Sequence, residues 1–289
     1  MYNKNSFTWG FELEVGDVDR RLTIPENLGE WEFSETDIVN MHTPYKGAAA
    51  DPLGLEPHWG GEINVKPAKT INEILDKIEQ ILQFFKDNGN TPTSNCISHS
   101  HIHVRIPGLK DDINSLKKLI VYIKENQHIV IDKCHNFRLD PLMSSTKTAK
   151  TYLKWDGGRP MPNYMCDNII NLATDFDSFI KLHAAGKDGI SMGRPFRYAI
   201  NTYCMKHIDT VEFRMFRNTL KREELEACFK FVERFMDCAL NNGPDVQEIL
   251  LETSYMFPQL QYDHEAYLKW EQSKYDKSRG NKVRKFYEI

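Results

Sequence analysis

The sequence has no run of about 18 consecutive apolar residues, the length that a membrane-spanning helix requires. Its N-terminal segment also lacks the charged start and the apolar stretch of a secretory signal peptide. These two absences argue against a membrane anchor and against secretion. We therefore expect a cytoplasmic protein with no membrane partner.

Cysteine and net charge are both low. The six cysteines include no Cys-x-x-Cys pair, which disfavours a disulfide framework and a thiolate zinc site. Cys166 has no sequence cue that ties it to a base, so the sequence gives little support for a nucleophilic cysteine. Lys and Arg total 37 against 41 Asp and Glu, a net charge of -4, so nucleic-acid binding is not indicated. The basic segment at 274–289 could contact nucleic acid or an acidic partner, but we interpret it as a solvated C-terminal tail.

Two glycine-rich nucleotide motifs are also missing. The chain contains neither the Gly-x-x-x-x-Gly-Lys-Ser/Thr phosphate loop nor the glycine fingerprint of dinucleotide-binding folds. If ATP binds to this protein, metal ions and arginines must hold its phosphates.

The apolar residues that are present repeat with the period of helices in four places. A helix is predicted over 70–88, where Thr70 and Glu73 form a capping box and Gly89 provides the end. Further helices are predicted over 113–123, 175–185 and 225–236, the last closing near 241–243. Segments 16–60 and 140–195 contain proline, glycine and aspartate clusters and are interpreted as loop insertions, most clearly over 140–168. We expect one α+β catalytic domain over 1–289.

Four other segments alternate apolar and polar residues with the period of a β-strand. They are 9–15, 60–65, 100–106 and 210–216. Each one alone would pass for a strand with its polar face in solvent. Together they are unusual because the polar positions carry acids, histidines and arginines in place of Lys, Thr, Ser and Gln. The polar residues of these strands are Glu12, Glu14, Glu62, Asn64, His101, His103, Arg105, Glu212 and Arg214.

The ligand types favour a hard cation over zinc. A His-x-His pair beside glutamates is compatible with a zinc hydrolase, because imidazole and carboxylate mix in catalytic zinc sites. Glutamate nevertheless outnumbers histidine in this set, and oxygen-rich sites favour Mg²⁺ or Mn²⁺, which commonly bridge nucleotide phosphates. The sequence therefore predicts a shared metal or phosphate site.

The ordered motifs resemble those of the amidoligase family, which has the glutamine synthetase-like carboxylate-amine ligase fold. The resemblance covers about residues 7–240 and rests on the order of the motifs more than on any one of them. The motifs are Gly10-Phe-Glu-Leu-Glu-Val15, Glu62 before a Lys-Pro turn, His101-Ile-His-Val104, Arg197-Tyr-Ala-Ile-Asn201 and Thr210-Val-Glu-Phe-Arg-Met-Phe216.

This resemblance implies a curved antiparallel sheet that binds ATP and divalent ions on its concave face, with helices packed on its convex face. It implies that Mg²⁺ or Mn²⁺ is held by Glu12, Glu14, Glu62, His101 and Glu212. Catalytic roles are expected for Arg197 and Arg214 on phosphate or acyl-phosphate oxygens, with His103 hydrogen-bonding a ligand or substrate. His101, Arg105, Arg194 and Asn201 are the candidate nucleotide contacts. Glu56 is a candidate for a further acidic ligand.

The function that follows is ATP-dependent formation of an amide bond between a carboxylate and an amine, through an acyl phosphate, on a small molecule, a peptide or a modified macromolecule. Two other classes stay open. One is a metal-dependent phosphohydrolase or nuclease that uses the same glutamates and histidines. The other is a binding module that keeps the sheet and a metal without turnover. The sequence does not indicate the oligomeric state. It does predict that glutamates converging on one face of the sheet repel each other when no cation is bound.

Overall fold

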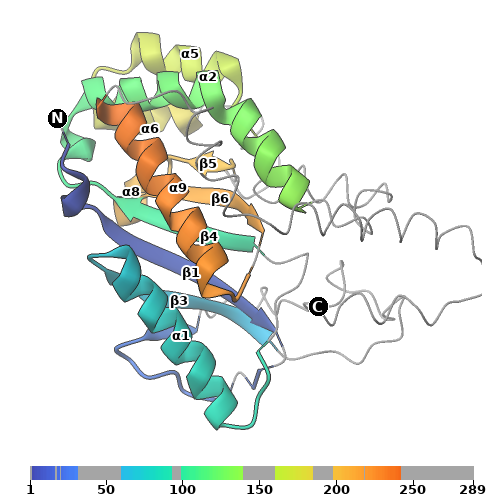
Figure 1. The fold of residues 1–289 in the computed structure, drawn as a ribbon. Helices are drawn as coiled ribbons and strands as arrows, with labels where there is room; N and C mark the ends of the chain where they lie inside the picture. The colour runs from blue at the N-terminus through green and yellow to red at the C-terminus, as the bar shows by residue number, and fades with distance from the viewer. Residues whose placement is uncertain are drawn as a thin grey trace, which may run out of the picture.

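The protein is described by a computed structural model. The described residues are 2–16, 18–19, 21–31, 60–92, 99–138, 160–184, 198–217 and 219–241. Within these ranges the chain forms one open antiparallel sheet covered by helices, which is the α+β class that the sequence predicts (Figure 1).

Six strands form the sheet, in the order β2-β3-β1-β4-β6-β5, and every neighbouring pair is antiparallel. The strands are β1 (Thr8–Gly16), β2 (Gly29–Trp31), β3 (Gly60–Ala68), β4 (His99–Arg105), β5 (Ile200–Asn201) and β6 (Val211–Arg217). All four strands predicted from alternating polarity are confirmed. They occupy the four central positions of the sheet and are contiguous there.

Helices follow strands β3, β4, β5 and β6 along the chain. They are α1 (Ile71–Asp87), α2 (Ile113–Arg138), α5 (Asn163–Leu172), α6 (Phe176–Ala184), α8 (Met205–Ile208) and α9 (Arg222–Asn241), with short 3-10 turns η1 (Lys4–Ser6) and η2 (Leu109–Asp111). The helix predicted over 113–123 extends well beyond its apolar pattern. The other three predicted helices are confirmed close to their expected bounds.

Three of these helices lie side by side on the apolar face of the sheet. Helix α1 contacts β3 and β1, α2 contacts β6, and α9 lies between these two helices (Figure 1). The ring of Phe229 on α9 contacts Trp9 and Phe11 of β1, and Phe235 contacts Phe213 of β6. Because side chains alternate along a strand, this packing directs the intervening polar residues to the opposite face.

Helix α1 begins where the sequence predicts. The Thr70 side chain accepts a hydrogen bond from the Glu73 amide, and the Glu73 carboxylate accepts one from the Thr70 amide. This reciprocal pairing satisfies amides that have no partner within the helix. The chain leaves the helix through Gly89, whose φ of 78° is readily adopted by glycine.

The prediction of loops over 16–60 and 140–168 is wrong at two points. Strand β2 forms within the first segment and pairs with β3, and the N-terminal half of α5 falls within the second. The sequence predicts a loop in place of α5 because this helix begins directly after Pro-Met-Pro at 160–162, a sequence that is typical of a turn. Its buried residues Met165, Cys166 and Ile169 form a short helical stripe on the side that packs against α2.

Two absences expected from the sequence can be examined in the described part of the chain. No helix there is both long enough and apolar enough to cross a membrane.

The described cysteines Cys166, Cys204, Cys228 and Cys238 carry free thiols. Burial, with a smaller contribution from Asp167, raises the pKa of Cys166 to about 12. The Cys166 thiol is therefore protonated at neutral pH, which argues against a role as nucleophile.

A buried histidine joins α6 to the loop that follows β5. Nε2 of His183 lies 2.8 Å from Oγ1 of Thr202, and the imidazole contacts the Phe179 ring at 4.8 Å between centroids. Burial lowers the pKa of His183 to about 3. The native protein therefore keeps this imidazole neutral, whereas an unfolded histidine accepts a proton below about pH 6.5.

This difference predicts how stability changes with pH. The native-state pKa is depressed, so the His183 contribution is fully present above about pH 6.5 and is lost as the pH falls towards 3, at about 1.4 kcal/mol per pH unit. Urea unfolding should show that the wild type loses more stability between pH 6.5 and pH 5.0 than His183→Gln does, because glutamine at position 183 does not titrate. The exposed His207→Gln variant is the control and should keep the wild-type difference. Equal losses in all three proteins would contradict the assignment.

Candidate metal centre

The pairing of the central strands brings the predicted polar residues close together. Glu12 of β1 lies opposite His101 of β4, and His103 of β4 lies opposite Glu212 of β6. On the other side of β1, Glu14 lies opposite Glu62 of β3. Directly opposed residues project from the same face of a sheet. The polar face thus carries one continuous group of ionisable side chains, and we call Glu12, Glu62, His101, His103 and Glu212 the Glu/His cluster.

Glu12 is the centre of this cluster. One oxygen, Oε2, makes a short hydrogen bond with Nδ1 of His101, and the other, Oε1, lies 2.8 Å from Nε2 of His103. Burial by itself would raise the pKa of Glu12, but its attraction to the two imidazoles outweighs that effect and holds the pKa well below its ordinary value. The carboxylate is therefore ionised and accepts hydrogen bonds from both rings.

Glu212 is buried and uses its two oxygens differently. Nη1 of Arg214 donates a short, charge-assisted hydrogen bond to Oε1. Nδ2 of Asn201 donates to Oε2 at 2.8 Å, and the Cys204 thiol donates to the same oxygen at 3.0 Å. Burial opposes ionisation here too, yet the Arg214 guanidinium keeps the pKa of Glu212 below its ordinary value.

The two histidines are both buried but differ electrostatically. Burial followed by the charge of Arg214 lowers the pKa of His101, despite the nearby glutamates. Burial is the largest single effect on His103 as well, but the combined interactions with Glu12 and Glu212 outweigh it and raise the pKa of His103. Nδ1 of His103 lies 3.1 Å from Oγ1 of Thr210, which fixes the ring plane. One imidazole thus favours the neutral form that binds metals, and its neighbour favours the cation.

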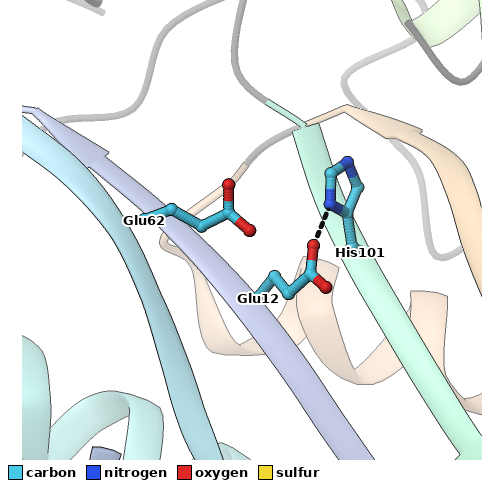
Figure 2. A group of neighbouring side chains, drawn as sticks. All are labelled: Glu12, Glu62 and His101. Carbon is cyan, nitrogen blue, oxygen red and sulfur yellow. Dashed lines mark hydrogen bonds and ion pairs between the residues drawn. The ribbon is translucent and has the colours of Figure 1, made fainter. Parts of the chain in front are cut away.

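Two overlapping groups within the cluster have the spacing of metal ligands. The first consists of Glu12, Glu62 and His101, whose side chains converge from β1, β3 and β4 in Figure 2. The second consists of Glu12, His103 and Glu212. Within each group the potential ligand atoms lie within 4.8 Å of one another. Glu12 belongs to both groups.

The remaining candidates are distributed differently. Glu14 is buried beside Glu62 but belongs to neither group. Arg105 is half exposed, and its Nε donates to Oδ2 of Asp209 at 2.8 Å, the contact of a surface ion pair. Asn201 contacts the cluster through Glu212. Arg194, Arg197 and Glu56 lie outside the described residues.

Sequence reasoning missed Cys204 and Thr210. Cys204 is three residues beyond Asn201, at the turn into α8, and its thiol points at Glu212. Burial, followed by the charge of Glu212, raises the pKa of Cys204, so the thiol remains a hydrogen-bond donor. Thr210 precedes β6 and contacts His103. Neither residue carries a sequence signal, because both contacts depend on how β5 and β4 pair with β6.

The contacts of Glu12 and Glu212 alter the electrostatics expected for the cluster without metal. Mutual repulsion of glutamates would predict that Gln variants melt at the same or a higher temperature. Each of these carboxylates instead has cationic or N–H partners within the cluster. Removing one charge should therefore destabilise the protein.

We predict that Glu12→Gln lowers the free energy of unfolding of the metal-free protein by about 1–3 kcal/mol. The amide of this variant has a single acceptor oxygen, whereas the imidazoles of His101 and His103 each bond to a different oxygen of Glu12 in the wild type. Saturating Mn²⁺, at about a hundredfold excess over Kd, should stabilise the wild type by about 2.7 kcal/mol and the variant much less. Glu79→Gln is the matched control, because Glu79 pairs with Arg222 on the surface and should change stability by less than about 1 kcal/mol. Wild-type stability and Mn²⁺ response in Glu12→Gln would contradict the central role of Glu12.

Comparisons with known proteins identify no relative. No family model, no curated protein and no solved structure matches this chain. The functional argument therefore rests on the cluster itself and on the motifs of the sequence.

Proposed function

We propose that this protein is an ATP-dependent carboxylate-amine ligase that requires Mg²⁺ or Mn²⁺. The observation that carries the proposal is the sharing of Glu12 by two groups of potential metal ligands at the centre of the polar face. Two adjacent divalent ions are a common arrangement in enzymes that transfer phosphoryl groups. The resemblance to amidoligases supplies the reaction type.

The donor set fits divalent ions. Carboxylate oxygens make up two of the three ligands in each group, and one imidazole completes each. The cluster is held on four paired strands and not on loops, which fixes the backbone positions of its ligands. When bound there, the ions would neutralise phosphate oxygens and allow a negatively charged carboxylate to approach the γ-phosphate of ATP.

The chain's own residues would perform three further tasks. Arg214 reaches the cluster from β6, and its planar guanidinium suits the oxygens of a phosphate or an acyl phosphate. His103 would hydrogen-bond a ligand or substrate while Thr210 fixes its ring. Asn201 would orient the Glu212 carboxylate. Arg197 and Arg194 are proposed as additional phosphate contacts on the basis of the family motif.

The finer features of the fold are part of the same proposal. A glutamine synthetase-like sheet would be curved, with ATP on its concave face and helices on its convex face. Support comes from the packing of α1, α9 and α2 on the face opposite the cluster. The substrates would be a small-molecule or peptide carboxylate and an amine.

A metal-dependent phosphohydrolase or nuclease is the second candidate. The specific observation in its favour is that each ligand group contains a histidine, and imidazole also suits zinc and other transition ions. Such an enzyme would cleave a phosphate ester or a phosphodiester with water and would not need ATP as a second substrate.

The ligase proposal predicts that phosphate release from ATP depends on an added amine. Purified protein should be incubated with ATP, Mg²⁺ and mixed pools of carboxylates and amines, and the products identified by phosphate assay and mass spectrometry. We expect ADP and phosphate, because an acyl phosphate is formed by transfer of the γ-phosphoryl group. Glu79→Gln should retain this activity and Glu62→Gln should lose most of it.

Other products would redirect the assignment. AMP and pyrophosphate would indicate an acyl adenylate and contradict the proposed mechanism. Phosphoester cleavage without ATP would support the hydrolase. Metal binding with no turnover in any pool would leave a binding module as the better description.

A further inference from the structure

The carboxylate of Glu212 presents only one oxygen to the rest of the cluster. Its Oε2 is fixed by Asn201 Nδ2 at 2.8 Å and by the Cys204 thiol at 3.0 Å. Its Oε1 lies on the side of the histidines, 3.9 Å from Nδ1 of His101 and 3.9 Å from Nε2 of His103. Any ion that uses Glu212 together with a histidine would therefore contact Oε1.

Arg214 already holds that oxygen. Its Nη1 donates to Oε1 in a short ion pair buried within the protein. Neighbouring ligands of one octahedral Mg²⁺ lie about 3 Å apart, because each metal–oxygen bond is about 2.1 Å. The separation of 2.8 Å between Glu12 Oε1 and His103 Nε2 fits neighbouring positions, and the 3.9 Å between His103 Nε2 and Glu212 Oε1 is closer to the about 4.2 Å between opposite positions. An ion bound to Glu212 would contact Oε1, the atom that the Arg214 guanidinium already holds.

The pairing of β4 with β6 is irregular at Arg214. The pairing of β4 with β6 shifts register between Ser100 and Ile102, which lie opposite Phe216 and Phe213. Arg214 is therefore one of two residues in a β-bulge. Bulges interrupt the ladder and redirect side chains, and they are frequent beside active sites.

We propose that Arg214 is a tethered cation that neutralises Glu212 when no divalent ion is bound and is displaced from Oε1 when the ion binds. Displacement frees the guanidinium to bind a phosphate oxygen, so ion binding creates part of the anion site. Arg214 thus couples the two binding events. The inference rests on the proposed metal site and adds an order of assembly, ion before phosphate.

The first test compares Mn²⁺ affinity among variants of the full chain, measured from the free-ion signal in electron paramagnetic resonance. Arg214→Met removes the competing cation and should lower the Kd for Mn²⁺ by about tenfold, as expected for loss of a charged hydrogen bond. Arg214→Lys keeps the charge and should stay within about threefold of the wild type. Arg222→Met is the matched control, since Arg222 pairs with Asp76 and Glu79 on the exposed surface, and it should not alter the Kd.

The second test measures the coupling with inorganic phosphate as the probe. In the wild type, Mg²⁺ should tighten phosphate binding, and phosphate should tighten Mg²⁺ binding by the same factor. That factor should fall by about tenfold in Arg214→Met, because no guanidinium is released. Nuclear magnetic resonance of wild-type protein with ¹⁵N-labelled arginine provides a measurement that needs no folded Met variant. The side-chain N–H signal absent from Arg214→Lys should shift on addition of Mg²⁺ alone.

The outcomes separate this inference from the ligase proposal. Unchanged or weaker Mn²⁺ binding in Arg214→Met, or an Arg214 signal that ignores Mg²⁺, would overturn the displacement of Arg214. Absence of Mn²⁺ binding by the wild type would overturn it as well. Tighter Mn²⁺ binding in Arg214→Met with no amine-dependent turnover of ATP would support the displacement and reject the ligase.

Discussion

The register of β1 against its neighbours is the constraint on which the site depends. It places Glu12 opposite His101 on one side and Glu14 opposite Glu62 on the other. A slip of one residue would turn these polar side chains into the helix layer and expose Phe11 and its apolar neighbours. The packing of Phe229 and Phe235 against the sheet therefore fixes the cluster as firmly as any contact within it.

Charge balance explains how such a cluster persists on a largely buried face. An isolated charge in this environment would be costly, so buried ionised groups need partners. Glu12 is balanced by the imidazoles, and Glu212 by Arg214. The same partners that stabilise the metal-free protein occupy the ligand atoms that a cation would use. In the proposed metal site, stability without metal and affinity for metal would thus be linked through single side chains.

Short apolar patterns were harder to interpret than long ones. The stripe of α1 and its capping box made that helix predictable, whereas α5 begins directly after two prolines and buries only a few residues. Strand β2 has three residues, too few to establish a period, and it exists because β3 offers an edge to pair with. Cys204 reached the site for a similar reason, through the pairing of β5 with β6.

The sequence by itself determined which residues form the central strands and which of their side chains share a face, because alternation with period two is a local property of the chain. It also determined the chemistry available on that face. Only the tertiary structure decided that β3, β1, β4 and β6 lie next to one another, that Glu12 bridges both histidines, and that Arg214 holds Glu212. These contacts join residues as much as 91 positions apart, and strand order and register between such distant segments depend on packing of the whole core.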